Sequence, residues 1–270
     1  MFDNFPHAVR IKKIIKETPL VHSYIFDYPA RAKPGQFVNI WIPGVDEKPM
    51  SIAFDDGKSY KLSIAAIGHG TQELKKKKVG DYIGIRGPYG THFSWKKKQR
   101  IAMLAGGYGA GPLYFAAFLA VKDGCHIDFF LGARGKAHLL FAAQIKKLKN
   151  TRFLPSTDDG SFGFKGHNVA CWTEQMEKGT RYDLVMTCGP EPMMKSVSDI
   201  AWGKKIDAQI SVERYMKCGF GICGNCCVDD LGVTTCQNGT VMPNTMARQI
   251  KEFGVYHRDS VGRKHTFKNV

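Results

Sequence analysis

The chain has 270 residues, of which 43% are hydrophobic, eight cysteines and a formal net charge of +15. This length and apolar content suffice for two domains and a small additional region, which excludes a disordered chain or a minimal disulfide scaffold. The first residues, from Met1 to His7, lack the basic segment and apolar core of a secretory signal. We therefore expect a cytoplasmic protein whose cysteines stay reduced.

Two features of the composition suggest functions that the rest of the sequence does not support. The lysines are densest at residues 75–78 and 96–98, but no basic motif with interleaved aromatic residues accompanies them. We expect a solvated basic surface that does not bind nucleic acid. The uncharged residues 101–121 could cross a bilayer by length alone. Because they include several glycines and Pro112, we expect a buried strand, a turn and a helix there, and no membrane association.

The first part of the chain has the pattern of short strands separated by turns. We expect strands at residues 8–15, 21–26, 34–41, 52–54, 60–65 and 82–86, and one helix near residues 71–78. The stretch from Asp55 to Lys58 is a hairpin signal between two of these strands. Six strands at this spacing predict a small antiparallel barrel over residues 1–97.

Strands and helices alternate in the next part of the chain. We expect strands at residues 101–105, 126–131, 152–154 and 183–188, and helices at residues 111–121, 139–149, 170–178 and 191–202. This alternation predicts a doubly wound parallel sheet over residues 98–208. The fold class is therefore an α+β barrel domain followed by an α/β domain, with a small cysteine-bearing region and tail at residues 209–270.

Four cysteines in that last region have the C-x4-C-x2-C…C spacing of plant-type [2Fe–2S] ligands, namely Cys218, Cys223, Cys226 and Cys236. The glycines among them allow the backbone to approach the sulfurs closely. A four-cysteine zinc site is the main alternative, but such sites usually contain two C-x2-C pairs and this loop has one. Disulfides would suit a small secreted chain better. We predict an iron–sulfur cluster on these four cysteines, with Cys227 as a spare.

Two parts of the sequence are candidate phosphate sites. The turn at residues 105–113 lies between a predicted buried strand and a helix, where backbone amides and the helix dipole can hold a pyrophosphate. Tight turns of any doubly wound sheet also use glycines, so the pattern alone leaves both interpretations open. In the barrel, Lys48 to Ser51 and Gly68 to Thr71 form a possible second site. By composition alone, an ordinary pair of turns on the barrel rim is the favoured interpretation.

Taken together, the motifs resemble the ferredoxin-reductase superfamily and, more closely, the electron-transfer subunits of NAD-linked dihydroorotate dehydrogenases. The resemblance extends from about Lys33 to the end of the chain. It rests on the cysteine loop and on seven short motifs, which are Gly35-Gln-Phe37, Lys48-Pro-Met-Ser51, Gly70-Thr71, Gly87-Pro-Tyr-Gly90, Gly106-Gly-Tyr-Gly109, Thr157-Asp-Asp-Gly160 and Cys188-Gly-Pro-Glu-Pro192.

The resemblance implies FAD bound by the barrel and NAD(H) bound by the second domain. The residues implied at the flavin and its phosphates are Lys48, Pro49, Met50, Ser51, Ser63, Ile64, Ala65, Gly70 and Thr71. Those implied at NAD(H) are Gly107, Tyr108 and Gly109 for its phosphates, Asp158 for its adenosine ribose, and Cys188, Gly189 and Pro190 for its nicotinamide. The family motif usually begins with arginine and often has an aromatic residue in third place, where this chain has Lys48 and Met50. Lysine keeps the charge but loses the planar fork.

The resemblance further implies an oxidoreductase subunit that passes electrons between NAD(H), FAD and the [2Fe–2S] cluster. Hydride transfer to a flavin needs no general base, so we expect no catalytic residue in that sense. The partner would be an FMN-containing dihydroorotate dehydrogenase catalytic subunit of pyrimidine biosynthesis, assembled as a heterotetramer, with Phe220 and Ile222 at the docking surface. Asp158 favours NAD(H) over NADP(H), although Arg134 and Lys136 could accommodate a 2′-phosphate. The alternatives are a flavin subunit of an NAD(P)H–ferredoxin or sulfide oxidoreductase and, more remotely, a zinc-bearing nucleic-acid-binding protein.

Overall fold

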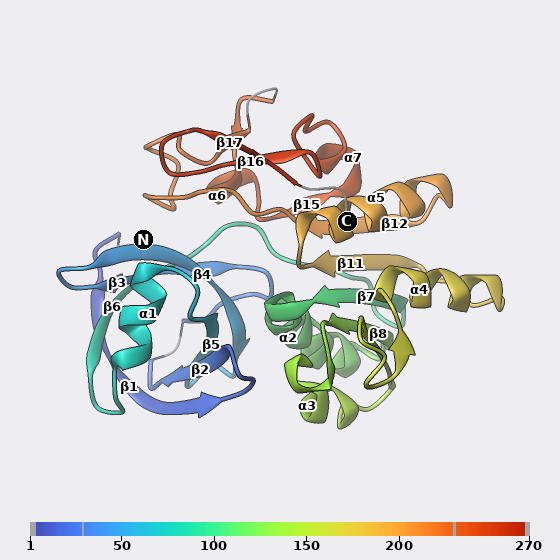
Figure 1. Cartoon of the computed structure of the whole chain (residues 1–270), viewed down its shortest axis with the longest axis horizontal. Coiled ribbons are helices and arrows are strands. Elements are labelled where there is room, and N and C mark those ends of the chain that lie inside the picture. The colour runs from blue at the N-terminus through green and yellow to red at the C-terminus, as the bar shows by residue number, and fades with distance from the viewer. Residues whose placement is uncertain (1–3, 29, 229–230, 268–270) are drawn as a thin grey trace.

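The computed structural model describes residues 4–28, 30–228 and 231–267. Figure 1 shows three groups of elements, with the barrel of the N-terminal residues beside an α/β domain and the C-terminal residues lying across the top of both. None of the helices in these described ranges is long and apolar enough to span a membrane.

The barrel is closed by six antiparallel strands in the order β1-β2-β5-β4-β3-β6. They are β1 (His7–Lys16), β2 (Val21–Phe26), β3 (Phe37–Ile42), β4 (Asp46–Asp55), β5 (Tyr60–Ala65) and β6 (Tyr82–Tyr89), and helix α1 (His69–Lys76) follows β5. Along β5 every second residue is buried, as a strand with one face in a barrel requires. The predicted hairpin is present, since Asp55 pairs with Tyr60 and accepts the N–H of Gly57 at 2.7 Å.

The second domain is a seven-stranded sheet in the order β10-β9-β8-β7-β11-β12-β15. Its strands are β7 (Arg100–Gly106), β8 (His126–Ala133), β9 (Thr151–Thr157), β10 (Phe164–Lys165), β11 (Leu184–Cys188), β12 (Asp207–Ser211) and β15 (Val241–Pro243). All neighbouring strands are parallel except β15, which pairs antiparallel with β12. The predicted doubly wound sheet is confirmed.

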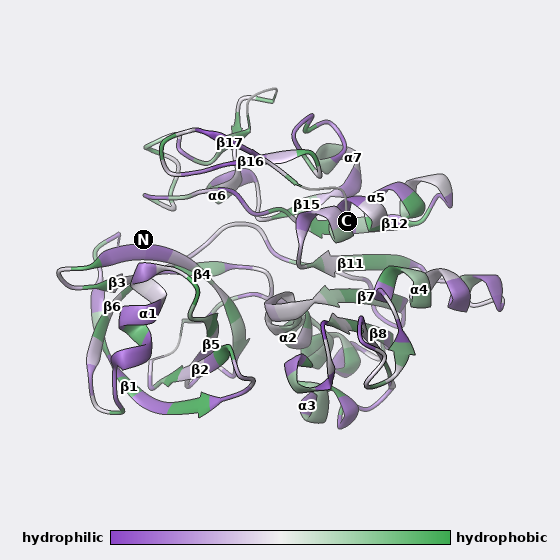
Figure 2. Cartoon of the chain, in the orientation of Figure 1, coloured by the Kyte–Doolittle hydropathy of each residue, from purple (hydrophilic) through white to green (hydrophobic). Residues whose placement is uncertain are grey.

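Helices cover both faces of this sheet. They are α2 (Ala110–Ala120), α3 (Ala142–Lys146), α4 (Asn168–Glu177) and α5 (Glu191–Gly203). One core contains Met103 of β7 with residues of α2 and α3, and the other contains Leu104 of β7 with residues of α4 and α5. The central strands β7 and β11 are therefore hydrophobic on both faces, as Figure 2 shows by their green colour. The uncharged residues 101–121 form β7, a 3₁₀ turn at Gly107–Gly109 and α2, as expected.

The structure differs from the expectations in two places. The helix expected at residues 139–149 is only α3, because Phe141 has a left-handed backbone (φ 60°) and the helix begins after it. Strands β10, β12 and β15 lie outside the strands expected from the sequence, because each is too short to give a distinct signal. The boundary expected at residue 208 lies inside β12.

The C-terminal region is joined to the second domain. It contains β13 (Cys227–Val228), β14 (Val233–Thr234), α6 (Thr235–Asn238), α7 (Asn244–Ala247), β16 (Tyr256–Arg258) and β17 (Lys264–Thr266). Besides contributing β15, it places Ala247 and Phe253 in the core shared with α4 and α5. Buried Arg214 pairs through Nη1 with Glu191 Oε2 at 2.7 Å and through Nε with Glu252 Oε1 at 2.5 Å. This network fastens both ends of the region to α5.

Candidate functional site

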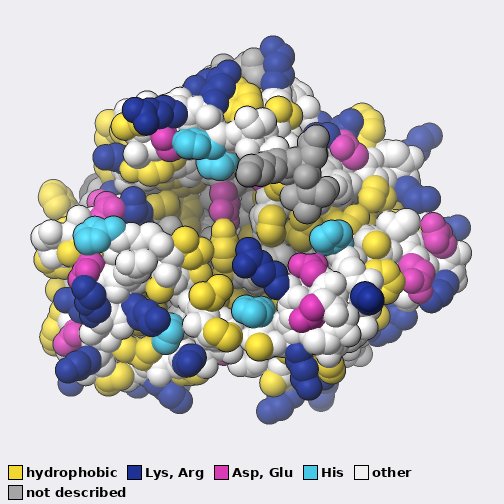
Figure 3. All heavy atoms as spheres, viewed as in Figure 1, with side chains coloured by type: hydrophobic (Ala, Val, Ile, Leu, Met, Phe, Trp, Pro, Cys, Tyr) yellow, Lys and Arg dark blue, Asp and Glu magenta, His cyan; other side chains and the backbone are white. Residues whose placement is uncertain are grey.

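A cavity of about 560 Å³ lies where the barrel, the sheet domain and the C-terminal region meet. Figure 3 shows the surface hollowed at this junction, whereas lysine and arginine side chains are spread over all three parts. The volume is in the range that suits a cofactor.

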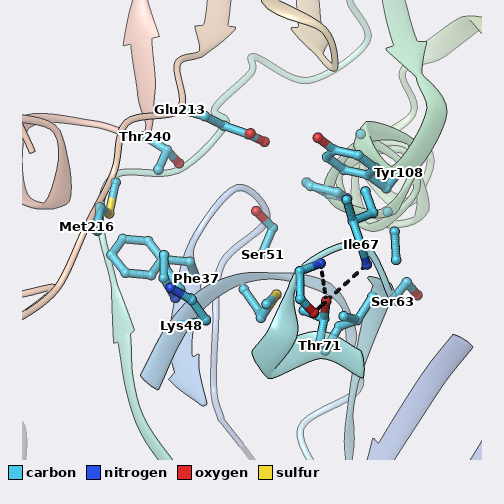
Figure 4. A pocket seen from close by; sticks show the side chains of 18 of the residues that line it. Phe37, Lys48, Ser51, Ser63, Ile67, Thr71, Tyr108, Glu213, Met216 and Thr240 are labelled. Atoms are coloured by element: carbon cyan, nitrogen blue, oxygen red, sulfur yellow. Dashed lines mark hydrogen bonds between the residues drawn. The ribbon is translucent and has the colours of Figure 1, made fainter. Parts of the chain in front are cut away.

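The barrel wall of this cavity contains every flavin-site residue predicted from the sequence. They come from β4, β5 and the start of α1, and they are Lys48, Pro49, Met50, Ser51, Ser63, Ile64, Ala65, Gly70 and Thr71. Strands β4 and β5 are hydrogen-bonded neighbours, so residues 48–51 of β4 and residues 63–65 of β5 lie in one wall. The Thr71 hydroxyl accepts the N–H groups of Ile67 and Gly68 at 3.1 Å each (Figure 4). Thr71 therefore shapes the turn that presents the start of α1 to the cavity.

Lys48 supplies a cation to this wall. Its Nζ lies 2.9 Å from Asp46 Oδ2 and 5.4 Å from the ring centroid of Tyr215. Burial tends to raise the pKa of Asp46, but the hydrogen bonds from Lys48 and from the N–H of Glu47 outweigh it and lower that pKa. The pair is thus ionised, and the ammonium is held at the cavity beside Gly70, whose absent side chain leaves room next to Asp46.

On the sheet side, the turn after β7 packs directly on the loop after β11. A Cβ added to Gly109 would lie 2.2 Å from the Cys188 carbonyl oxygen, and one added to Gly106 would lie 2.5 Å from Pro190 Cδ. The glycine pattern therefore reflects the close approach of two loops. Tyr108, Gly109 and Cys188 line the cavity, whereas Gly107, Gly189 and Pro190 belong to the same two loops without lining it.

Asp158 lies apart from the cavity lining. It follows β9 at the edge of the sheet, its N–H donates to the Ala133 carbonyl at 3.1 Å, and its half-exposed carboxylate is 3.4 Å from His167 Nδ1. Asp158 thus lies at the carboxyl edge of the sheet, where ligands of doubly wound sheets bind.

The four predicted cluster cysteines lie as two pairs. The N–H of Cys223 donates to Cys218 Sγ, and the N–H of Cys236 donates to Cys226 Sγ, each at 3.4 Å. The β13–β14 hairpin follows the third ligand, Cys226, and leads to the fourth, Cys236 in α6. Cys227 lies in β13 with its sulfur 3.8 Å from the Val228 carbonyl oxygen.

The chemistry of these thiols fits a cluster with two irons. Burial raises the pKa of Cys218, but the N–H groups of Cys223, Phe220 and Ile222 outweigh it and lower that pKa to about 6. Burial and the adjacent Cys226 sulfur raise the pKa of Cys236, so two thiolates at this spot need a cation between them. Across the described ranges, no three His, Cys, Asp or Glu side chains are close enough to hold a single metal ion. Two pairs of cysteines suit two irons better than one zinc.

Comparisons with known proteins agree with this geometry. A family model for the iron–sulfur cluster binding domain of dihydroorotate dehydrogenase B matches residues 213–245, and one for an oxidoreductase NAD-binding domain matches residues 103–199. A probable dihydroorotate dehydrogenase B (NAD(+)) electron transfer subunit of Methanocaldococcus jannaschii is 46% identical over 259 residues, covering 96% of this chain and 98% of that protein. The chain belongs to the dihydroorotate dehydrogenase B electron transfer subunit family. A second member, from Methanothermobacter thermautotrophicus, is 38% identical and covers 97% of both chains.

Solved structures show the same fold as this family member. The NADH-dependent reduced ferredoxin-NADP oxidoreductase, described in terms of flavin-based electron bifurcation, has a TM-score of 0.80 and 27% identity and covers 88% of both chains. A ferredoxin NADP+ reductase from Neisseria gonorrhoeae with bound FAD and NADP has a TM-score of 0.65, at 17% identity, and covers 74% of this chain and 92% of that one. The predicted family, fold class and cofactor set of FAD, [2Fe–2S] and NAD(H) are confirmed, and the zinc-bearing nucleic-acid-binding alternative is wrong.

The third wall of the cavity in this family member was not expected from the sequence. Residues 213–216, between β12 and the cysteine loop, line it together with Phe37 and Thr240. The Glu213 side chain points across the cavity toward Tyr108 (Figure 4). Glu213 is exposed to the open cavity, but desolvation by the surrounding walls and the charge of Glu191 raise its pKa to about 7 despite the opposing effect of Arg214. No motif marks these residues, and their position directly before the first cluster cysteine was the only available signal.

Phe220 is placed differently from the expectation. Its ring packs inward, 6.2 Å from the Tyr89 ring and 5.3 Å from the Arg86 guanidinium, and it joins the small core that contains Cys226 and Cys236. Ile222 projects outward with 79% of its surface exposed, and Cys223 is also exposed. The docking surface expected around Phe220 and Ile222 stays a prediction, in which Ile222 is the more exposed of the two residues.

Proposed function

We propose that this chain passes electrons between NAD(H) and an FMN-containing dihydroorotate dehydrogenase catalytic subunit by way of FAD and the [2Fe–2S] cluster. The observation that carries the proposal is a shared wall. Phe37 and Met216 line the cavity, and both also pack in one small core with Cys226 and Cys236 (Figure 4). The flavin site and the cluster site would thus be back to back, separated by a layer of apolar side chains.

The proposed binding roles follow from the positions of the residues. Lys48 and the amides at the start of α1 would hold phosphates, since a fixed ammonium and a helix N-terminus both favour anions. Cys188 would border the nicotinamide, Tyr108 and Gly109 would meet the phosphates of NAD(H), and Asp158 would accept a hydrogen bond from the adenosine ribose. When bound, NAD(H) would give or accept a hydride, FAD would convert between electron pairs and single electrons, and the cluster would carry single electrons.

In this arrangement the chain positions its cofactors and excludes water, and it supplies no general base. Phe37 and Met216 are both buried, so they keep water out of the space between the two sites. Hydride transfer requires close alignment of the two rings, which the packed loops at Gly109 and Cys188 would fix from one side.

The partner is proposed from the exposed end of the cysteine loop. Ile222 and Cys223 are exposed in the cysteine loop, as are Gly224 and Asn225, and an exposed isoleucine there suits burial by another protein. The relatives are named as an electron transfer subunit, which implies a catalytic partner. We extend this to an FMN-containing subunit in a heterotetramer, located in the cytoplasm. The eight free thiols of the chain suit that reducing compartment.

Reconstitution tests the proposal. The purified chain should reduce artificial dyes with NADH but should not oxidise dihydroorotate. Adding an FMN-containing dihydroorotate dehydrogenase subunit should restore NAD-linked dihydroorotate oxidation. Failure of that addition, combined with rapid reduction of ferredoxin, would favour the second candidate, an NAD(P)H–ferredoxin oxidoreductase subunit. That candidate is supported by the likeness to the ferredoxin-NADP oxidoreductase structure.

A further inference from the structure

Two buried side chains of the barrel, Asn39 and Arg86, donate hydrogen bonds to the start of the cysteine loop. Asn39 of β3 and Arg86 of β6 are paired residues on neighbouring strands, and they are 0% and 7% exposed. Arg86 Nη1 donates to the Cys218 carbonyl at 2.5 Å, and Nη2 donates to the Lys217 carbonyl at 3.3 Å. Asn39 Nδ2 donates to the same two carbonyls, at 2.9 Å to Lys217 and 3.3 Å to Cys218. Asn39 and Arg86 face each other on neighbouring strands, and each donates to the carbonyls of both Lys217 and Cys218. These two carbonyls lie more than 130 positions later in the chain.

The Arg86 guanidinium is itself fixed from the other sides. Its Nε donates to the Glu47 carboxylate of β4, so the cation lies between that carboxylate and the cysteine loop. The Arg86 Cζ atom lies 5.3 Å from the centroid of the Phe220 ring and 5.9 Å from the centroid of the Tyr89 ring. A planar guanidinium with several donors can satisfy all these partners at once, which an ammonium cannot.

Strand β4, which contains Glu47, also contains the cavity residues 48–51 that are predicted to contact the flavin. Glu47 directly precedes Lys48, and β4, β3 and β6 are consecutive in the barrel. A rigid connection therefore runs from the cavity residues of β4 through Glu47 and Arg86 to the backbone of the first cluster cysteine. The loop is close-packed at this point, because a Cβ added to Gly219 would lie 3.2 Å from Asn39 Nδ2.

We propose that Arg86, with Asn39 beside it, is a positioning residue that sets both the place of Cys218 relative to the flavin barrel and the reduction potential of the cluster. Reduction adds one electron, and so one negative charge, to the iron–thiolate group. A poorly solvated cation on the cluster side of Glu47 stabilises that added charge and raises the reduction potential. Asn39 contacts the same two carbonyls but is uncharged, so it holds the loop in place without raising the reduction potential. This inference rests on the proposed function only in taking the cluster as [2Fe–2S].

Three variants of the full chain, each reconstituted anaerobically with FAD and cluster, separate charge from geometry. Arg86→Gln removes the positive charge but keeps an amide donor. Arg86→Lys keeps the positive charge but loses the planar guanidinium with its several donors. Asn39→Ser changes the loop contact without changing any charge and is the control. The readouts are iron and labile sulfide per chain, FAD content, the rate of cluster loss to a chelator, and the midpoint potential from a titration followed by electron paramagnetic resonance.

We expect Arg86→Gln to shift the midpoint potential to a more negative value with FAD content unchanged. Arg86→Lys should retain a potential near that of the wild type and lose its cluster several-fold faster. Asn39→Ser should also lose the cluster faster, with no comparable shift in potential. Loss of FAD from Arg86→Gln would show that this variant does not fold. In that case the cluster lifetimes of Arg86→Lys and Asn39→Ser test the inference.

A wild-type potential in Arg86→Gln, or wild-type cluster lifetimes in both Arg86→Lys and Asn39→Ser, overturns the inference. A wild-type chain that binds iron and sulfide normally but couples to no dihydroorotate dehydrogenase subunit overturns the proposed partner instead and leaves this inference standing. The two failures are therefore distinguishable.

Discussion

Glu213 and Tyr108 face each other across the cofactor cavity, with the carboxylate of one directed at the hydroxyl of the other (Figure 4). Glu213 is the first cause of the raised pKa of Tyr108, about 12, and burial is the second. The two residues come from opposite walls, one from the segment before the cysteine loop and one from the turn after β7. The other ionisable groups that act on Glu213 are Glu191 and Arg214, and Glu213 in turn helps to raise the pKa of Cys188 beyond what burial does.

The raised pKa of Glu213 predicts a pH dependence of stability. In the unfolded chain this carboxyl titrates near its ordinary value of 4.5, whereas in the native state it titrates near 7. The native state thus binds the proton more tightly, so stability should fall as the pH rises from about 4.5 to 7. The decrease should be small, because Glu213 is exposed to solvent in the cavity, which screens its charge. Between pH 5 and pH 8, Glu213→Gln should show a smaller decrease in the melting temperature of the holoprotein than the wild type. Glu174→Gln, which removes a half-exposed carboxylate from α4, is the control and should leave the wild-type decrease in place.

Cys223→Ser should abolish the [2Fe–2S] signal and leave FAD bound, because the flavin wall belongs to a separate barrel. Iron, labile sulfide and the visible spectrum measure this. Cys227→Ser is the matched control and should retain its cluster, since the Cys227 sulfur lies along β13. Stoichiometric zinc without iron in anaerobically prepared wild type would contradict the assignment.

The position of Asp158 predicts a preference for NADH over NADPH. Its carboxylate can accept a hydrogen bond from a ribose hydroxyl but repels a 2′-phosphate. Rapid mixing should show faster flavin reduction by NADH, and Asp158→Asn should narrow the difference several-fold. Arg134 and Lys136 lie near the same edge, where the Lys136 N–H donates to Ser161 Oγ at 2.9 Å. Faster reduction of the wild type by NADPH would show that these cations prevail.

Gly109→Ala should destabilise the sheet domain by about 1–3 kcal/mol, the usual range for overpacking. The new methyl group would meet the Cys188 carbonyl at 2.2 Å, so the two loops at the nicotinamide site must separate. Thermal unfolding and the rate of flavin reduction by NADH should both report this, with FAD retained. Gly203→Ala, at the end of α5 with no atom within 4 Å of the added Cβ, is the control and should be neutral or slightly stabilising. Equal effects of the two substitutions would refute the loop-contact explanation.

Ile222→Glu should weaken assembly with the catalytic subunit at least tenfold while NADH–dye activity stays close to that of the wild type. A carboxylate buried without a partner at an interface is strongly unfavourable. Val79→Glu, at a 60% exposed position on the barrel, is the matched control. Phe220→Glu is unsuited to this test, because it would place a carboxylate in the core beside the cluster cysteines. Unchanged assembly of Ile222→Glu would remove this surface from the interface.

The sequence by itself determined the features that depend on neighbouring residues in the chain. The C-x4-C-x2-C spacing identifies the cluster ligands because one loop supplies three of them. The alternation of apolar strands and helices likewise predicts the sheet, and Lys48 to Ser51 could be matched to the flavin wall because they are consecutive. These signals are local, so no knowledge of the packing is needed to detect them.

Only the tertiary structure decided the features that depend on residues distant in the chain. Glu213 meets Tyr108, and Arg86 and Asn39 meet Lys217 and Cys218, because folding brings the barrel, the sheet domain and the C-terminal segment to one junction. The inward packing of Phe220 has the same origin, since an aromatic ring beside a cysteine loop is buried only if a cation and a second ring from the barrel cover it. The pKa of Glu213 also depends on this junction, because desolvation by the cavity walls and the charge of the distant Glu191 raise it above that of an ordinary glutamate, although the side chain is exposed in the cavity.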